Sequence, residues 1–298
     1  MTNTALDILK NFKPSKKFFV GVDSDGCAFP TMELKHKECF IPNIIKYWGL
    51  QAVSKFGREA AEWVNLYSVH RGVNRFPALV MTMELLKERP ELQQSKVKIP
   101  DLSSLKKFID SGVSLSNPSL EKAVQETHDP VLKKTLDWSQ QVNADIESMV
   151  HGAYPFPFVK DALKKLSQFA DIIVVSATPT PALQKEWQEH DLAKYVALIA
   201  GQEMGSKKDV LQLATTGKYE KDHVLMVGDA PGDHKAAKAN QALFLPINPG
   251  YEEASWELFF KEGLDKFINS SYANGYEEKL IKEFEKLLPT TPWWKEKK

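Results

Sequence analysis

The sequence has little cysteine, no long apolar run and no excess charge of either sign. Its two cysteines, Cys27 and Cys39, lie in a chain of 298 residues that is large enough to fold without disulfides, so we expect free thiols and a cytoplasmic setting. No run of about 18 apolar residues occurs, and a membrane span is therefore not expected. Basic and acidic residues both total 39, which predicts no nucleic-acid or membrane partner.

The N-terminal segment, residues 1–17, is polar and lacks the apolar stretch of a secretory signal. Hydrophobic residues make up 43% of the chain, which is enough to form a packed core. The length predicts about two domains.

Three short runs are apolar at nearly every position, at residues 17–23, 171–176 and 223–229. Such runs are typical of strands that are buried on both faces, as in parallel sheets with helices on either side. Weaker candidates lie at residues 195–200 and 242–245. The pattern predicts an α/β fold with a Rossmann-like parallel sheet.

A long segment between the first two strands has a different periodicity. From residue 37 to about 150, apolar residues recur mostly at spacings of three and four, which is typical of amphipathic helices. We therefore predict a helical domain at residues 32–150, inserted into a core made of residues 1–31 and 151–298. Residues 30–34 and 152–157 are the predicted hinges.

The first candidate site follows the first strand, where Asp23 and Asp25 are separated by one residue and followed by Gly26. Residues two apart at the end of a strand point to the same side, and Gly26 permits a sharp turn. By itself this pattern also fits a structural turn or a calcium loop.

The second candidate site follows the next strong strand, in the segment Ser176-Ala177-Thr178-Pro179. A hydroxyl group at the end of a strand can donate a hydrogen bond to a phosphoryl oxygen. The alternative is that Ser176 or Thr178 caps the following helix, which is the more common use of these residue types.

Two further segments complete the set. Gly228-Asp229 follows the last strong strand, with Asp233 four residues later, and Lys207 and Lys208 precede a helical pattern. Each has an ordinary alternative, since Asp229 suits a turn, Asp233 suits a helix cap, and lysines are usually solvated.

Taken together, the segments indicate one site, because ligands of open parallel sheets bind at the carboxyl ends of the strands. Two carboxylates about 4 Å apart repel each other by roughly 4 kcal/mol at an effective dielectric constant near 20. Several of them need a cation, and a set made only of oxygen ligands suits Mg²⁺. A lysine in the same place would balance the charge of a nucleophile and a phosphate.

These segments, in this order, resemble the haloacid dehalogenase superfamily in its phosphatase branch. The resemblance covers residues 17–29 and 154–249 and rests on Asp23-Ser24-Asp25-Gly26, Ser176, a lysine at 207 or 208, and Gly228-Asp229 with Asp233. The place of the helical insertion resembles the cap of phosphoserine phosphatase and β-phosphoglucomutase relatives.

The resemblance implies a role for each residue. Asp23 would attack phosphorus and form an aspartyl-phosphate, and Asp25 would serve as general acid and base. The metal ligands implied for Mg²⁺ are Asp23, the Asp25 carbonyl, Asp229 and Asp233. Ser176 and a lysine would fix the phosphoryl oxygens, with Ala177 and the second lysine beside the substrate. Lys208 is preferred to Lys207 because it lies three residues before Leu211, as in the family's Lys-x-x-Leu pattern.

A loop of the helical insertion carries His70, Arg71, Asn74 and Arg75 around Gly72. Polar donors in an interdomain loop could contact the substrate. The alternative is a solvated turn, or an arginine paired with an acid such as Glu62.

The resulting prediction is a Mg²⁺-dependent phosphatase, monomeric or homodimeric, that acts on a small phosphorylated metabolite. A phosphotransferase or mutase of the β-phosphoglucomutase type stays open, as does a binding protein without activity. A dehalogenase is disfavoured because that branch lacks a counterpart of Asp25. A phosphonate hydrolase would need a cap lysine, for which Lys35, Lys37 and Lys55 are candidates.

Overall fold

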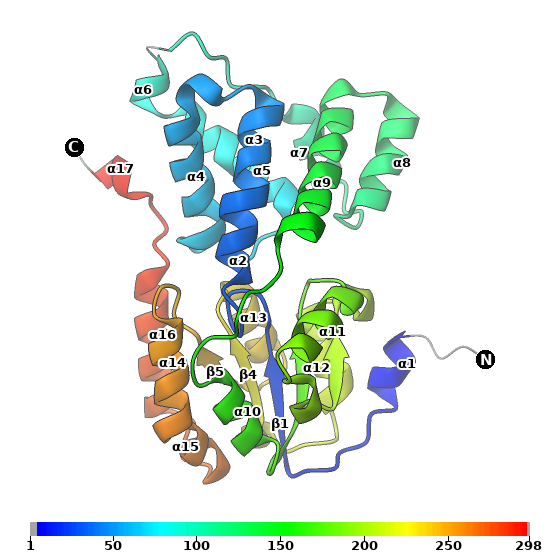
Figure 1. The fold of residues 1–298 in the computed structure, drawn as a ribbon, viewed down its shortest axis with the longest axis vertical. Helices are drawn as coiled ribbons and strands as arrows, with labels where there is room; N and C mark the ends of the chain where they lie inside the picture. Colours follow the sequence, from blue (N-terminus) through cyan, green and yellow to red (C-terminus); the bar gives the residue numbers. More distant parts are fainter. Residues whose placement is uncertain (1–4, 94, 297–298) are drawn as a thin grey trace. The chain divides into compact units, whose positions relative to one another are not determined.

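The computed structural model describes residues 5–93 and 95–296, and the chain divides into two compact units (Figure 1). The first, here the core unit, comprises Met1–Thr31 and Gly152–Pro289, and the second, here the helical unit, comprises Met32–His151 and Thr290–Lys298. The predicted domain boundaries assign residues 290–298 to the core, whereas the segment from Thr290 onward groups with the helical unit in the structure. The reason is that Trp294 packs against the apolar cluster of that unit.

The core unit contains a five-stranded parallel sheet, which confirms the predicted α/β class. Its strand order is β3-β2-β1-β4-β5, so the first strand lies at the centre. The strands are β1 (Phe18–Val22), β2 (Ala170–Val175), β3 (Leu198–Ala200), β4 (Val224–Gly228) and β5 (Leu243–Pro246). In register, Phe19 of β1 lies opposite Asp171 of β2 and Val224 of β4.

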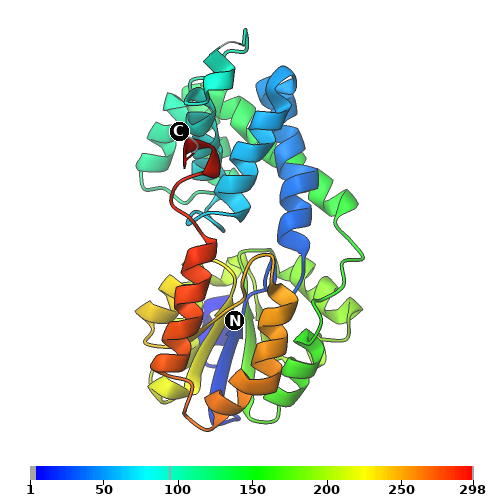
Figure 2. The same ribbon diagram turned by 90° about the vertical axis from the view of Figure 1, so that its left-hand side faces the viewer.

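Helices cover both faces of this sheet, which explains why the strands are apolar at every position. Successive residues of a strand point to opposite faces, so Phe18 and Val20 belong to one apolar cluster and Phe19 to the other. The first cluster is completed by α10 (Val159–Leu166), α11 (Thr180–Glu189), α14 (Glu252–Leu258) and α15 (Leu264–Ile268). The second is completed by α1 (Ala5–Lys10), α12 (Lys207–Thr215), α13 (Pro231–Ala239) and α16 (Gly275–Leu287). Figure 2 shows the core unit turned by 90°.

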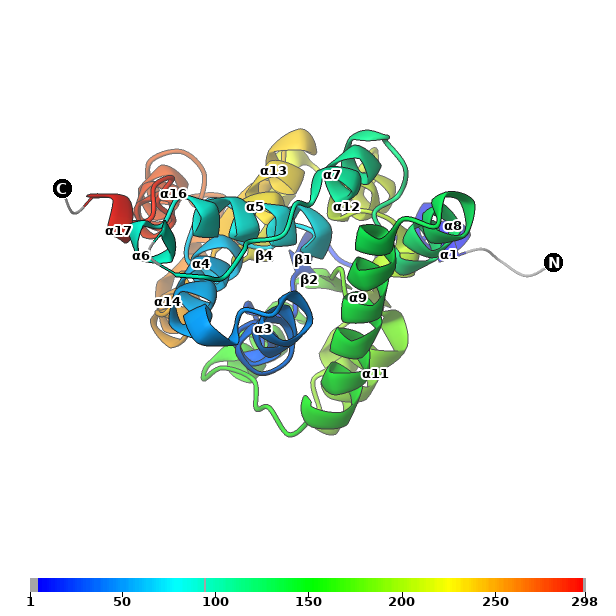
Figure 3. The same ribbon diagram turned by 90° about the horizontal axis from the view of Figure 1, so that it is seen from above.

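The helical unit contains no strand among its described residues (Figure 3). The chain passes into it through α2 (Thr31–Leu34) and a π-helical segment, Lys35–Phe40. The further helices are α3 (Ile41–Trp48), α4 (Ser54–Leu66), α5 (Arg75–Lys87), α6 (Pro90–Gln93), α7 (Ser103–Asp110), α8 (Asn117–Thr127), α9 (Pro130–Met149) and α17 (Trp293–Glu296). Among the described residues, no helix is both long and apolar enough to cross a bilayer.

Candidate active site

Asp23 lies directly after the central strand and is almost fully buried, with 5% of its surface exposed. Its amide still belongs to the sheet, since it donates to the Val227 carbonyl at 3.0 Å. The carboxylate accepts a hydrogen bond from the Ser24 amide at 2.7 Å through Oδ1. The end of β1 therefore fixes this carboxylate in a closed environment.

Two more buried acids follow β4, the neighbouring strand. Asp229 and Asp233 have 1% and 0% of their surfaces exposed, and Asp233 Oδ2 accepts from the Ala230 amide at 3.1 Å in the first turn of α13. A Cβ atom on Gly228 would lie 2.4 Å from the Asp233 side chain, so only glycine allows this approach. Carboxylate oxygens of Asp23, Asp229 and Asp233 all lie within 4.8 Å of one another.

A single lysine joins this acidic group. Lys207 Nζ donates to Asp23 Oδ2 at 2.6 Å and to Asp233 Oδ1 at 2.5 Å. The preference for Lys208 is therefore corrected, because Lys208 is exposed and its carbonyl accepts from Asn240. Successive helical residues differ in direction by about 100°, so when Lys207 points to the acids at the start of α12, Lys208 points elsewhere.

The electrostatics of this centre are dominated by burial and by mutual interaction of the charges. Burial raises the pKa of Asp23 well above its ordinary value, and Asp233 and Asp229 raise it further, although Lys207 opposes this. Burial alone would lower the pKa of Lys207, but Asp23 and Asp233 outweigh it, so the pKa is raised. Lys207 consequently stays protonated at neutral pH.

Asp25, the second acid of the first motif, has different surroundings. It is half-buried, and its two carboxylate oxygens accept from the Thr31 hydroxyl at 2.5 Å and from the Thr178 hydroxyl at 2.7 Å. Sequence reasoning missed Thr31 and considered Thr178 only as a helix cap. The pairing is long-range, since Asp25 and Thr178 are 153 residues apart, and no local motif signals it.

Ser176 lies at the carboxyl end of β2, beside the central strand, and is buried with 5% of its surface exposed. Its amide donates to the Ala200 carbonyl at 3.0 Å, and its Oγ accepts from the Thr178 amide at 3.2 Å. The capping alternative is not seen, because α11 begins at Thr180 and has no side-chain cap. Ala177 is exposed between the two hydroxyl residues.

The polar loop of the helical unit has partners within that unit. Arg71 is buried and donates to the Leu66 carbonyl at 2.8 Å, while the His70 ring lies edge-on to the Trp63 ring. Asn74 caps α5, since its Oδ1 accepts from the Phe76 amide.

Arg75 extends from the same loop to α9. Its Nη1 donates to Ser139 O at 3.1 Å, Ser139 Oγ at 2.9 Å and Asn143 Oδ1 at 2.8 Å. Burial lowers its pKa to about 10, so it stays charged at neutral pH. Substrate contact by these four loop residues stays a prediction.

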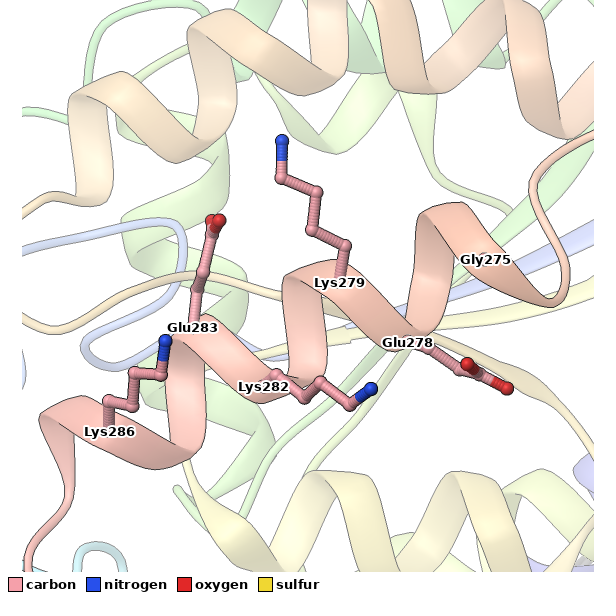
Figure 4. Close-up of a pocket in the computed structure, with 6 residues that line it drawn as sticks. All are labelled: Gly275, Glu278, Lys279, Lys282, Glu283 and Lys286. Atoms are coloured by element: carbon pink, nitrogen blue, oxygen red, sulfur yellow. The ribbon is translucent and has the colours of Figure 1, made fainter.

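A surface depression on α16 of the core unit is unrelated to the acidic centre. It is lined by Gly275, Glu278, Lys279, Lys282, Glu283 and Lys286. Figure 4 shows that these charged side chains extend in different directions from one helix. They do not converge on a common point, so we interpret this surface as a solvated helix face.

Comparison with known proteins gives a family and a fold. The sequence profile of the haloacid dehalogenase-like hydrolases matches residues 92–246, which is more than half of the chain and begins after the first motif. Comparison with the curated proteins gives no match.

Several solved structures are similar to this chain at low sequence identity. A haloacid dehalogenase-like hydrolase of Bacteroides fragilis is 13% identical, with a TM-score of 0.50 over 80% of this chain and 93% of that one. A family IA hydrolase of Entamoeba histolytica is 12% identical, with a TM-score of 0.48 over 85% and 99%. A protein described as a candidate phosphoglycolate phosphatase of Lactobacillus delbrueckii is 16% identical, with a TM-score of 0.46 over 85% and 98%. With its matching profile and parallel α/β core, the chain belongs to the haloacid dehalogenase-like hydrolases.

Proposed function

We propose that the protein is a Mg²⁺-dependent phosphatase that hydrolyses a small phosphorylated metabolite through an aspartyl-phosphate on Asp23. One observation carries the proposal. Asp23, Asp229 and Asp233 are buried within 4.8 Å of one another, and Lys207 links two of them. A structural role alone does not explain why three acids are buried so close together, because such a group is costly to desolvate.

The three acids fit a magnesium ion. Three carboxylates and one ammonium group have a formal charge of −3 + 1 = −2, which a divalent cation balances. All the ligands are oxygens, as Mg²⁺ prefers. Asp23, Asp229 and Asp233 would hold the ion through their side chains, with the main-chain carbonyl of Asp25 as a further ligand. When bound, Mg²⁺ would neutralise charge on the phosphoryl oxygens and orient them.

Asp23 is the proposed nucleophile. One of its carboxylate oxygens forms a bond to phosphorus as the bond between phosphorus and the leaving oxygen breaks. Asp25 gives a proton to that oxygen, and then takes one from the water that cleaves the aspartyl-phosphate. The hydroxyls of Thr31 and Thr178 hold the Asp25 carboxyl group from both sides, which suits a group that must meet the leaving oxygen in a fixed orientation.

Two further side chains would bind the phosphoryl group. Lys207 stays protonated because Asp23 and Asp233 raise its pKa, so it can balance negative charge on the group in transfer. The Ser176 hydroxyl lies at the end of the strand next to β1 and can donate to a second phosphoryl oxygen. Both act by positioning and by charge, which dominate phosphoryl transfer.

One observation supports phosphate ester hydrolysis over phosphonate cleavage. A Schiff-base lysine must lose its proton, whereas Lys37 donates to Glu33 at 2.6 Å. Burial alone would lower the pKa of Lys37, but hydrogen bonds with Glu33 and Tyr67 outweigh it and raise the pKa. Lys37 is therefore poorly suited to that role.

Phosphate release from a broad panel of phosphorylated metabolites tests the proposal. We expect release that depends on Mg²⁺, stops with EDTA and is lost in Asp23→Asn. Trapping of ³²P on the wild-type protein and not on Asp23→Asn would identify the nucleophile. Release that survives in Asp23→Asn would overturn the proposal. Labelled protein that passes its phosphoryl group to a sugar phosphate faster than to water would instead indicate the phosphotransferase.

A further inference from the structure

The end of the chain leaves the core unit and docks on the helical unit. Leu288, directly after α16, is buried in the second apolar cluster of the core unit. Pro292 is also buried, and Trp294 packs against the apolar clusters of the helical unit. With the crossings after Thr31 and before Gly152, the chain therefore connects the two units three times.

The docked segment, residues 290–296 and here called the C-terminal latch, holds an arginine of the helical unit. The Trp294 ring lies 3.9 Å from the Arg89 guanidinium carbon and 6.2 Å from the Trp63 ring. Arg89 is 2% exposed and forms an ion pair with Glu59. Arginine over tryptophan is a favourable cation–π arrangement, particularly when it is desolvated.

A second contact of the C-terminal latch is polar and exposed. Lys295 forms an ion pair with Glu88, and the two side chains keep 39% and 55% of their surfaces exposed. Beside it lies a cavity of about 230 Å³, lined by residues of the latch and of α4 and α5. The contacts of the latch thus include an aromatic anchor, Trp294, and a surface ion pair.

The linker to the C-terminal latch is short and stiff. Leu288 of the core unit and Pro292 of the latch are both buried, and because they are four residues apart they can be separated by at most about 14 Å. Pro289 and Pro292 restrict the backbone between them further. While the latch is docked, the helical unit cannot move farther from the end of α16 than this linker allows.

We propose that the C-terminal latch restrains movement of the helical unit relative to the core unit, and that its release widens the range of that movement. If the proposed function holds, on which this consequence rests, release also changes substrate access and product departure, because such steps often limit turnover in enzymes with moving domains.

Distances between spin labels on the two units test the restraint without any substrate. We place labels at Lys164→Cys in the core unit and Glu121→Cys in the helical unit, both exposed positions, while the native cysteines are buried. Trp294→Ala should broaden the distance distribution at least twofold. Trp293→Ala is the comparison variant and should broaden the distribution less, since this neighbouring ring is 49% exposed and its contact with Arg89 is longer, at 5.9 Å.

A charge exchange gives a second test that does not disturb buried residues. Lys295→Glu should broaden the distribution, and adding Glu88→Lys should restore it. An unchanged distribution in folded Trp294→Ala, or equal broadening in Trp293→Ala, would overturn the proposal. If Trp294→Ala does not fold, the charge exchange decides alone. A Lys295→Glu/Glu88→Lys variant whose distance distribution stays as broad as that of Lys295→Glu would then contradict the proposal.

Turnover separates this proposal from the proposed function. With any substrate that the wild-type protein hydrolyses, Trp294→Ala should change KM or kcat at least threefold, and Trp293→Ala should change them less. The distance measurement is made without substrate and therefore holds even if the protein hydrolyses no phosphate ester. Broadening without phosphatase activity would support the restraint and count against the proposed function alone.

Discussion

Buried charged side chains have different kinds of partner in the two units. In the helical unit, buried Arg71 donates to a carbonyl and buried Arg89 pairs with Glu59 under Trp294. In the core unit, three buried carboxylates lie close together, and Lys207 pairs with two of them, Asp23 and Asp233. The buried arginines thus connect segments within the helical unit, whereas the proposed function assigns the buried acids of the core unit to binding a cation, because burying like charges together costs stability.

Replacing the central acid should affect activity most, without loss of stability. We expect Asp23→Asn to lower kcat by about 10⁴-fold or more, as for other nucleophiles. In metal-free buffer the thermal midpoint should not fall, because one of three mutually repelling carboxylates is removed. Phosphate release and calorimetry with EDTA measure the two effects. A midpoint several degrees below that of the wild type would mean that Asp23 stabilises the fold. The buried charges of the core unit would then act like those of the helical unit.

The second-largest effect is expected at Lys207, and its exposed neighbour Lys208 serves as the control. Lys207→Met should lower kcat about 10²–10³-fold and should destabilise metal-free protein by about 3 kcal/mol, because it leaves buried carboxylates without their cation. Lys208→Met, at an exposed position, should change stability by less than about 0.5 kcal/mol. Steady-state kinetics give kcat for both variants, and urea unfolding with EDTA gives their free energies of unfolding. Equal effects of both changes would contradict the assignment of Lys207.

A cation should stabilise the core unit through its buried acids and not through exposed ones. At free Mg²⁺ of about 100 times the dissociation constant, the free energy of unfolding should rise by about 2.7 kcal/mol. Asp229→Asn should abolish most of this gain. Glu220→Gln is the control, since Glu220 belongs to a second, largely exposed group with Asp222 and His223. If Glu220→Gln abolishes this gain in unfolding free energy, the metal binds at the exposed group and not at the buried acids.

The sequence was sufficient for those parts of the site that depend on local order. Asp23 and Asp229 follow apolar runs directly, so the positions of β1 and β4 place both acids at one edge of the sheet. The choice between Lys207 and Lys208 depends on where α12 begins, and Ser206 sets this by capping the helix. The apolar partner three residues after Lys207 is Val210, which is buried as Leu211 is, so spacing alone could not decide.

Long-range contacts were not predictable from one sequence. The hydroxyls of Thr31 and Thr178 meet at Asp25 only because the loops after β1 and β2 lie side by side. The aromatic residues after Pro289 follow a short polar stretch that carries no periodicity, and their docking depends on Arg89 and Trp63 in another part of the chain. In both cases the partner, and not the local pattern, determines the role.

A smaller effect tests whether Arg75 holds helices together. Its guanidinium binds Ser139 and Asn143, so Arg75→Met should lower the free energy of unfolding by about 2 kcal/mol. Asn74→Ala removes the cap of α5 and an exposed hydrogen bond to the Leu115 carbonyl, and should cost about 1–2 kcal/mol. Urea unfolding measures both. If Arg75→Met instead raises KM and leaves stability unchanged, the arginine contacts substrate as the loop pattern predicted.

The smallest effect concerns Glu33, whose carboxylate accepts from Lys37 and from the Tyr67 hydroxyl at 2.6 Å each. Burial alone would raise its pKa, but these hydrogen bonds outweigh it and lower the pKa. A lowered pKa stabilises the folded state above the unfolded pKa, about 4.3, and this contribution is lost as the pH falls through the folded value. Glu33→Gln should therefore cost less than about 1 kcal/mol at pH 7, because the side chain is 36% exposed.

The free energies of unfolding of the wild type and of Glu33→Gln should be compared across a range of pH. The difference in unfolding free energy between wild type and Glu33→Gln should shrink as the pH falls; Glu38→Gln, at an exposed position of the π-helical segment that follows α2, is the matched control for removing a carboxylate from the same part of the chain. A difference that grows on acidification would mean that Glu33 is destabilised as a carboxylate, like Asp23. Glu33 would then resemble the buried acids of the core unit, and the difference in how the two units accommodate charged side chains would not hold at this position.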